Sequence, residues 1–199
     1  SVTAGSNNFV AGVNAGNSIV SGGDNNTLAG TNAGTAVTTG DFNTALGSQA
    51  LAQTNTSSQN TAIGGYAMYY NTTGGSNTAV GLQALLDNTT ASNNTAIGMN
   101  ALTNNTTGTQ NTALGGSSLA ANTTANYNTG VGYNSLAANT TGASNVAIGA
   151  AALDANTTGA SNVAVGRSAL TANTTGVENT AVGMRALVTN TTGDDNAAV

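Results

Sequence analysis

Few residues in this chain have side chains that could carry chemistry. Seven carboxylates and two arginines are its only charged groups, and it contains no histidine and no cysteine. Glu178 and Asp195 lie 17 residues apart, and Asp194 adjoins the second. Three carboxylates brought together with backbone carbonyl oxygens would suit Ca²⁺, which prefers oxygen ligands. Whether any Ca²⁺ binds is left open by the sequence.

Solvated turn charges are the interpretation that we favour for these three carboxylates. The glycine-rich calcium nonapeptide of other β-rolls is absent. Without histidine or cysteine, the commonest general base and the soft metal ligands are missing. We therefore predict no catalytic residues, no metal site and no cofactor, and we expect that the chain is not an enzyme.

Aromatic residues gather in one segment, where Tyr66, Tyr69 and Tyr70 lie close together. Tyrosine has an apolar ring and a polar tip, so an exposed cluster among Asn and Gln would suit a sugar platform. Local packing is the more ordinary interpretation, and we favour it.

Composition excludes other classes of function. Only 5% of the residues are charged and the net charge is −5, so the cationic surface of a nucleic-acid-binding protein is missing. Apolar runs are only a few residues long, so we predict no membrane insertion.

One unit accounts for most of the chain. The motif Asn-Thr-Ala-Val/Ile/Leu-Gly recurs every 17 residues from Asn43 to Asn179, and a last copy is cut off after Asn196, as in a segment of a longer polypeptide. We number each coil from this Asn as position 1. Fixed periods of this size are typical of stacked solenoid units. A disordered polar tract is the alternative, but such tracts do not repeat large aliphatic residues at a fixed phase.

Two columns of large apolar residues are predicted to form the structural core, and one column of glycines is predicted to form turns. The core residues at position 4 are Leu46, Ile63, Val80, Ile97, Leu114, Val131, Ile148, Val165 and Val182, and those at position 9 are Leu51, Leu85, Leu102, Leu119, Leu136, Leu153, Leu170 and Leu187. The turn residues at position 5 are Gly47, Gly64, Gly81, Gly98, Gly115, Gly132, Gly149, Gly166 and Gly183.

The pattern predicts an all-β fold, a parallel β-solenoid (β-roll) with 17-residue coils. Positions 1–4 and 7–10 are expected to form two short strands per coil, each paired with its equivalent about 4.8 Å away. Asn at position 12 is expected to stack in hydrogen-bonded ladders. Residues 43–199 hold the regular repeats, truncated in the last one. Residues 1–42 carry a worn version with a spacing of 18 and are predicted to form irregular coils or a junction.

Lateral association is expected to stabilise so narrow a rod. Each coil buries only about two large aliphatic residues, whereas the backbone of all 17 residues must be ordered. The Ala columns at positions 3 and 8 are predicted to form flat strips on which copies pack. The alternative is that these Ala residues are interior because the coil is too narrow for larger ones.

The Asn-Thr-Ala-Val/Ile-Gly and Ala-Leu pattern resembles two kinds of repeat. One is the Asn-Ser-Val-Ala-Ile-Gly unit in the heads of trimeric autotransporter adhesins, which are left-handed parallel β-rolls packed as trimers. The other, with a similar Asn-Thr-Thr-Gly corner, occurs in tail fibres and spikes of marine phages. The resemblance covers residues 43–199 well and residues 1–42 weakly, and the adhesin unit is a few residues shorter.

This resemblance implies a structural segment of an extracellular attachment fibre, a viral tail or capsid fibre shaft on the virion surface. It further implies a homotrimer and contact with a host-surface glycan or receptor. A bacterial cell-surface trimeric adhesin or filament subunit is the alternative.

Threonine columns suggest a third function, ice binding by a β-solenoid. The Thr residues at positions 13 and 14 are adjacent and would point to opposite sides of an extended segment, whereas a flat array needs Thr two residues apart. We therefore rank ice binding below the fibre.

Overall fold

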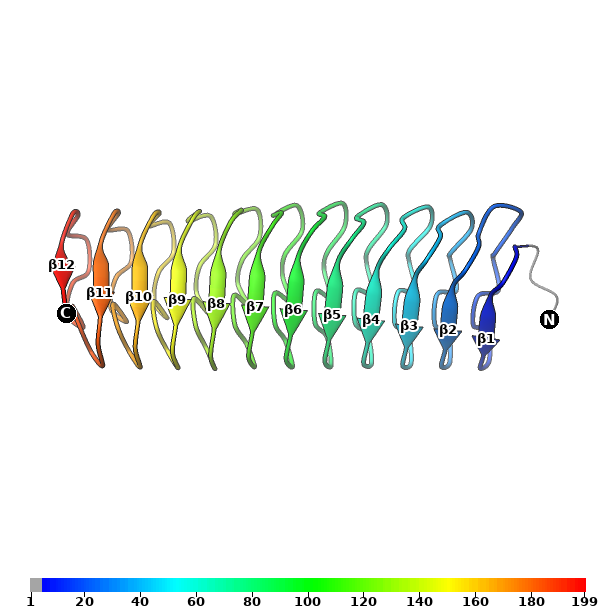
Figure 1. Cartoon of the computed structure of the whole chain (residues 1–199), viewed down its shortest axis with the longest axis horizontal. Helices are drawn as coiled ribbons and strands as arrows, with labels where there is room; N and C mark the ends of the chain where they lie inside the picture. Colours follow the sequence, from blue (N-terminus) through cyan, green and yellow to red (C-terminus); the bar gives the residue numbers. More distant parts are fainter. Residues whose placement is uncertain (1–4) are drawn as a thin grey trace.

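Short strands stack in sequence order along residues 5–199, the part of the chain that the computed structural model describes. They form one parallel sheet of twelve strands, drawn as a rod in Figure 1. The strands are β1 (Phe9–Ala11), β2 (Thr27–Ala29), β3 (Thr44–Leu46), β4 (Thr61–Ile63), β5 (Thr78–Val80), β6 (Thr95–Ile97), β7 (Thr112–Leu114), β8 (Thr129–Val131), β9 (Val146–Ile148), β10 (Val163–Val165), β11 (Thr180–Val182) and β12 (Ala197–Ala198). The predicted parallel β-solenoid with 17-residue coils is confirmed.

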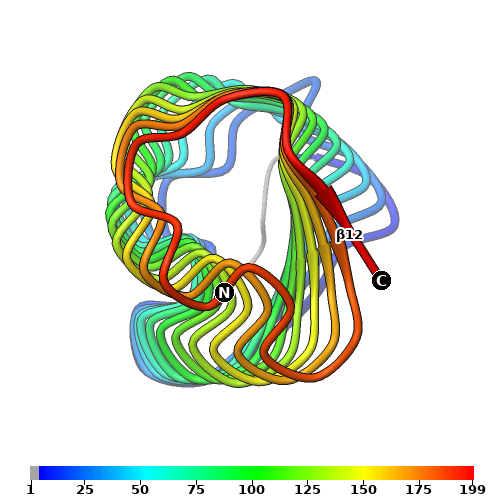
Figure 2. The ribbon, with the colours of Figure 1, turned by 90° about the vertical axis from the view of Figure 1, so that its left-hand side faces the viewer.

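Register follows the repeat. Thr61 pairs with Thr78 and Ala62 with Ala79, so equivalent positions of successive coils lie side by side. Seen from the end, the coils superpose with a gradual twist (Figure 2). At about 4.8 Å for each step between strands, the sheet extends for roughly 50 Å.

The N-terminal coils belong to the same sheet. β1 pairs with β2 in parallel, with Phe9 opposite Thr27, a step of 18 residues. β2 in turn pairs with β3 at the regular step of 17 residues. Residues 1–4 of the predicted N-terminal region lie outside the described residues.

The prediction of a second strand at positions 7–10 is wrong. These residues form turns, because positions 7 and 9 both have positive φ. In the coil that begins at Asn77, Gln83 has φ 57° and Leu85 has φ 51°, and the same pattern recurs along the rod. An extended strand cannot contain alternating left-handed residues. The coils are nevertheless hydrogen-bonded here, since the backbone N–H of Leu85 donates to the carbonyl of Ala101 at 3.0 Å.

The prediction that the aliphatic column at position 4 belongs to the core is also wrong. Leu46, Ile63, Val80, Ile97, Leu114, Val131, Ile148, Val165 and Val182 are all exposed or half-buried, and Leu46 keeps 52% of its surface exposed. Side chains alternate along a strand, so positions 2 and 4 face outwards when position 3 faces inwards. Position 3 is fully buried wherever it is Ala between Ala45 and Ala181, as at Ala79 and Ala96.

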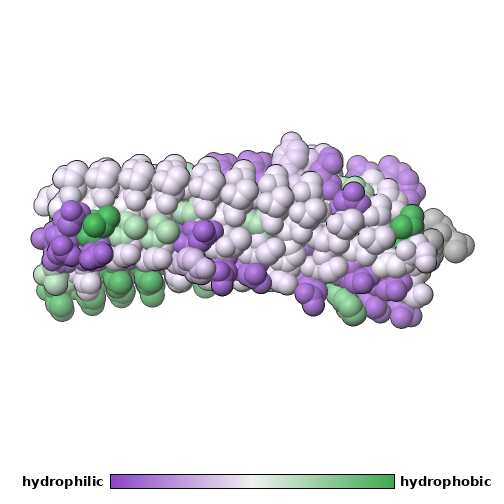
Figure 3. Space-filling model, turned by 90° about the horizontal axis from the view of Figure 1, so that it is seen from above, coloured by the Kyte–Doolittle hydropathy of each residue, from purple (hydrophilic) through white to green (hydrophobic). Residues whose placement is uncertain are grey.

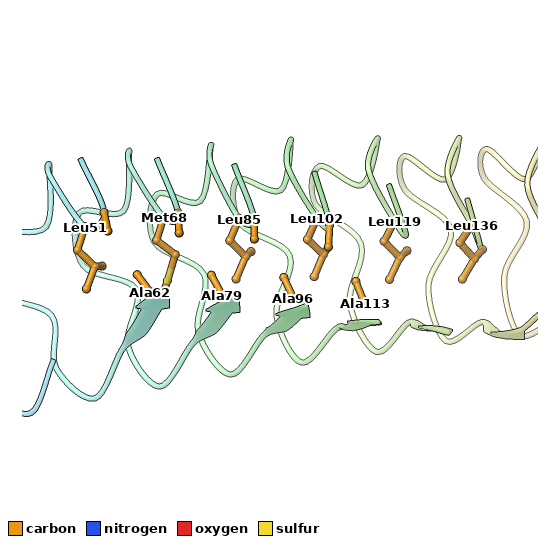
Figure 4. Packing of buried hydrophobic residues seen from close by; sticks show 14 of the residues in the cluster. Leu51, Ala62, Met68, Ala79, Leu85, Ala96, Leu102, Ala113, Leu119 and Leu136 are labelled. Carbon is orange, nitrogen blue, oxygen red and sulfur yellow. The ribbon is translucent and has the colours of Figure 1, made fainter. Parts of the chain in front are cut away.

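Leucine at position 9 fills the interior opposite the Ala of position 3 (Figure 4). Leu51, Leu85, Leu102, Leu119, Leu136, Leu153 and Leu170 are fully buried, and Leu187 in the last coils is half-buried. Ala at position 8 is buried as well, for example Ala84 and Ala101. The Ala columns therefore line the core, and the predicted outer strips for packing copies are not there.

In the first two coils the interior is filled by a large residue at position 3 and a small residue at position 9, the reverse of the regular coils. There position 3 is large, as Val10 and Leu28, and position 9 is Gly16 or Gly34. A Cβ added to Gly34 would lie 2.7 Å from Cδ2 of Leu28, closer than packed atoms allow. Positions 3 and 9 thus share one fixed interior volume, which is filled from one side or the other.

Two ladders of asparagine run inside the rod. At position 12, Nδ2 of Asn88 donates to Oδ1 of Asn71 at 2.8 Å and to the carbonyl of Ala91 at 3.0 Å. This confirms the predicted stacking of Asn side chains at the corner. At position 1, the backbone N–H of Asn94 donates to Oδ1 of Asn77 at 2.9 Å. No buried side-chain nitrogen or oxygen within residues 5–199 lacks a partner.

Corners form where the sequence predicted them. The nine position-5 glycines from Gly47 to Gly183 have φ between 131° and 138°, a region open essentially only to glycine. A search of residues 5–199 for a helix that could cross a membrane found none.

Candidate functional site

The outward side chains of the strands form a continuous surface, here named the outer strand face. It consists of positions 2 and 4 of the regular coils, from Thr44 and Leu46 to Thr180 and Val182. No charged residue occupies these positions. Apolar side chains of this kind project in a row along the lower edge of Figure 3, over the C-terminal coils. An aliphatic column spaced by one coil thus lies open to a partner.

Threonine occupies position 2 in most coils and lies two residues from the aliphatic column. Thr78, Thr95 and Thr112 follow one another in register on adjacent strands. The hydroxyls of these three residues make no hydrogen bond with any residue between 5 and 199. They are free to meet water or another surface. Position 2 is valine only at Val146 and Val163.

The Thr rows at positions 13 and 14 differ from each other. At position 13 the hydroxyl of Thr89 donates to the carbonyl of Thr106 at 3.1 Å, and this bond repeats along the rod. At position 14, Thr90 and its equivalents are exposed. The preceding Asn88 is fully buried, so the Asn-Thr-Thr triplets, which match a glycosylation sequon, hide their acceptor amide in the fold.

Two aspartates at equivalent positions of distant coils accept hydrogen bonds from the backbone. Oδ1 of Asp194 accepts a hydrogen bond from the backbone N–H of Val177 at 2.8 Å, and Asp41 does the same for Asp24 at 2.7 Å. Across residues 5–199 no group of three or more potential ligands is arranged to hold a metal ion. Glu178 and Asp195 are exposed residues with positive φ at position 17.

The three neighbouring tyrosines form an aromatic cluster at the edge of a hollow in the surface. The ring centroids of Tyr66 and Tyr69 are 5.6 Å apart, and those of Tyr69 and Tyr70 are 4.6 Å apart in an edge-on arrangement. Tyr70 borders a groove of about 490 Å³, here named the Tyr70 groove. Its lining residues are Gln53, Tyr70, Thr72, Asp87, Thr89 and Thr106.

Burial in this groove raises the pKa of Asp87 above its usual value, because the carboxylate is partly withdrawn from water. Burial likewise raises the pKa of Asp154, which lies at position 10 of a later coil. The sequence indicated the tyrosines as a candidate site, but the proximity of Asp87 to Tyr70 was not predicted. The two side chains are neighbours because position 11 of successive coils forms one column. The 17-residue spacing of Gln53, Tyr70 and Asp87 was the signal that could have predicted this.

In comparisons with protein-family models and with curated proteins, the chain matches none of them. What the structure establishes for this chain is its architecture, a repetitive parallel β-solenoid of 17-residue coils.

Proposed function

We propose that this chain is a stiff structural segment of an extracellular attachment fibre, a viral tail or capsid fibre shaft that assembles as a homotrimer. The ladder that is unbroken from β1 to β12 is the observation that carries the proposal. A rod whose cross-section repeats from coil to coil transmits force along its axis and keeps its two ends at a fixed separation.

The composition supports a role outside the cell and among proteases. Only two residues, Arg167 and Arg185, are trypsin-type cleavage sites. Position 13 Thr hydroxyls and both Asn ladders tie each coil to the next, so a protease would have to open several coils together. Such resistance suits a fibre exposed on a virion.

The outer strand face supports assembly of identical copies. Its aliphatic column is apolar, uncharged and at least partly exposed in every coil, whereas exposed apolar patches of soluble monomers are small. A second copy of this chain has the same spacing between coils, so each aliphatic side chain meets an equivalent partner along the rod. Three copies, as in the adhesin heads that the repeat resembles, would enclose this face around one axis.

Light scattering tests the homotrimer. At micromolar concentration we expect a mass three times that of the chain. Replacing Val80, Ile97 and Leu114 with lysine should reduce it to that of one chain, because lysine ammonium groups would be desolvated without partners in the seam. These side chains point outwards, so each coil should still fold.

The matched control replaces Thr90, Thr107 and Thr124 with lysine in the same three coils, at the exposed position 14. This variant should retain the mass of the unmodified protein. A single-chain mass for the unmodified protein, or an unchanged mass for the first variant, would overturn the proposed assembly.

Ice binding is a second candidate, favoured by one observation on the same face. Thr hydroxyls and aliphatic methyl groups lie two residues apart, about 6.6 Å, on successive strands, and so form a regular grid of the kind that orders water. This use requires the outer strand face to be open and is incompatible with a closed seam. The two functions therefore exclude each other in one molecule.

Thermal hysteresis measures this second function. If it holds, a micromolar solution should show hysteresis that Thr95→Lys abolishes and Thr107→Lys preserves, since only Thr95 lies on the outer strand face. Absence of hysteresis in the unmodified protein would reject ice binding and leave the fibre proposal intact.

A further inference from the structure

The Tyr70 groove lies in the half of the regular rod where the residue at position 11 varies from coil to coil. Position 11 holds Gln53, Tyr70, Asp87 and Asn104 in four successive coils. The next four coils hold alanine there, at Ala121, Ala138, Ala155 and Ala172. The Thr row at position 13 continues unchanged through both halves of the rod. The scaffold therefore does not require large or polar side chains at position 11.

Tyr70 contributes an aromatic surface to this groove. Its ring packs edge-on against Tyr69, which in turn contacts Tyr66. Nevertheless, 49% of the surface of Tyr70 remains exposed. A ring held by neighbours and open to solvent loses little conformational entropy when a ligand stacks on it.

Polar groups flank the ring on both sides. Gln53 and Asp87 lie one coil before and one coil after Tyr70, about 4.8 Å away along the rod. Among residues 5–199, neither side chain has a hydrogen-bond partner, although both line the groove. The hydroxyls of Thr72, Thr89 and Thr106 donate to carbonyls of the next coils, so their oxygens remain available as acceptors. The groove thus combines an aromatic face, a carboxylate, an amide and a row of hydroxyl oxygens.

We propose that the Tyr70 groove binds a neutral saccharide. A pyranose ring has an apolar C–H face that can stack on Tyr70, and hydroxyls that can donate to Asp87 and exchange hydrogen bonds with Gln53. The volume of about 490 Å³ is in the range of small-ligand sites. Acidic sugars are disfavoured because no cation lines the groove and the Asp87 carboxylate would repel them.

Partial desolvation lowers the free-energy cost of exchanging water for a sugar hydroxyl at this carboxylate. Burial already raises the pKa of Asp87, so part of its hydration is lost before any ligand arrives. The groove also lies half a coil away from positions 2 and 4, so assembly through the outer strand face leaves it open. The inference rests on the proposed attachment role for its biological meaning, but the binding itself is independent of the oligomeric state.

Saturation-transfer NMR on the full chain tests the site with lactose, maltotriose and triacetylchitotriose as neutral probes and sialyllactose as the acidic counterpart of lactose. We expect at least one neutral probe to bind with a dissociation constant on the order of 1 mM. Sialyllactose should bind more weakly than lactose. Tyr70→Ala should weaken the bound neutral probe roughly tenfold, in line with the loss of one stacking contact.

Two further variants make the result specific. Asp87→Ala should also weaken binding. Because this variant leaves the tyrosine packing untouched, it still tests the site if Tyr70→Ala disturbs the fold. Tyr133→Ala removes a tyrosine that is 65% exposed and outside the groove, so it should bind as the unmodified protein does. The proposal is overturned if no neutral probe binds at millimolar concentration, or if Tyr70→Ala and Asp87→Ala both bind normally. A single-chain mass in light scattering together with sugar binding would reject the homotrimer and keep this site.

Discussion

Replacing Gly98 with alanine is expected to lower the free energy of unfolding by about 2–5 kcal/mol. Gly98 has φ 137°, which an L-residue with a Cβ rarely adopts at a cost of ~1–3 kcal/mol. The added Cβ would also lie 2.5 Å from the carbonyl oxygen of Gly115 in the next coil. This carbonyl belongs to the backbone, so the clash is relieved only by separating the coils.

Thermal unfolding followed by circular dichroism measures the effect, and a loss of this size corresponds to a lower midpoint by roughly 4–20 °C for a chain of this length. Gly116→Ala is the matched control. A Cβ at Gly116 would meet its nearest atom, Cδ2 of Tyr133, at an ordinary 3.5 Å. Equal midpoints for the two variants would show that the position-5 corner does not hold the coils in register.

Removing the side chain of Asn94 should have the second largest effect, a loss of about 2–4 kcal/mol. Nδ2 of Asn94 donates to the carbonyl of Gly108 at 2.8 Å, and its Oδ1 accepts from the backbone N–H of Asn111 at 2.9 Å. Alanine leaves that N–H buried without a partner, which alone costs ~1–3 kcal/mol. The empty volume of the missing amide adds to this cost.

Hydrogen exchange of the Asn111 amide locates the damage, since this proton should exchange much faster in Asn94→Ala. Asn104→Ala provides the control because Asn104 is exposed and takes no part in either ladder. Asn94→Asp keeps the acceptor for Asn111 but buries a carboxylate. It should therefore be less stable at neutral pH than at a pH where the carboxyl is protonated. Stability of Asn94→Ala equal to that of Asn104→Ala would contradict a structural role for this ladder.

The period of the repeat was sufficient to predict the architecture. Parallel pairing in register follows when equivalent residues recur at a fixed step, and Thr61 lies beside Thr78 accordingly. Burial of the Leu column and stacking of Asn at position 12 also followed from residue type. The position-9 leucines were expected in a strand, however, and their positive φ was not foreseen. That conformation costs ~1–2 kcal/mol per residue, which burial of the same side chain offsets with ~1.5–3 kcal/mol.

The face of the strand was predicted the wrong way round because alternation separates two sides without saying which is inside. Large residues were assigned to the interior by size. The exchanged pair of Leu28 and Gly34 contained the missing information, since it shows that position 3 shares its space with position 9. Ala79 at position 3 and Leu85 at position 9 make up such a pair in the regular coils. Reading these two positions together would have placed the aliphatic column outside.

The step of 17 residues between successive strands from β2 onwards has a consequence for how such a chain changes over generations. Genetic recombination between neighbouring copies removes or adds whole units of 17 residues, and each such event leaves every ladder and both faces in alignment. Loss of one residue within a strand would turn its inward side chains outwards, whereas the 18-residue step from β1 to β2 shows that a loop can hold one extra residue while the strands stay in register. Length is therefore a quantity that evolution can adjust in discrete increments of one coil without redesigning anything else.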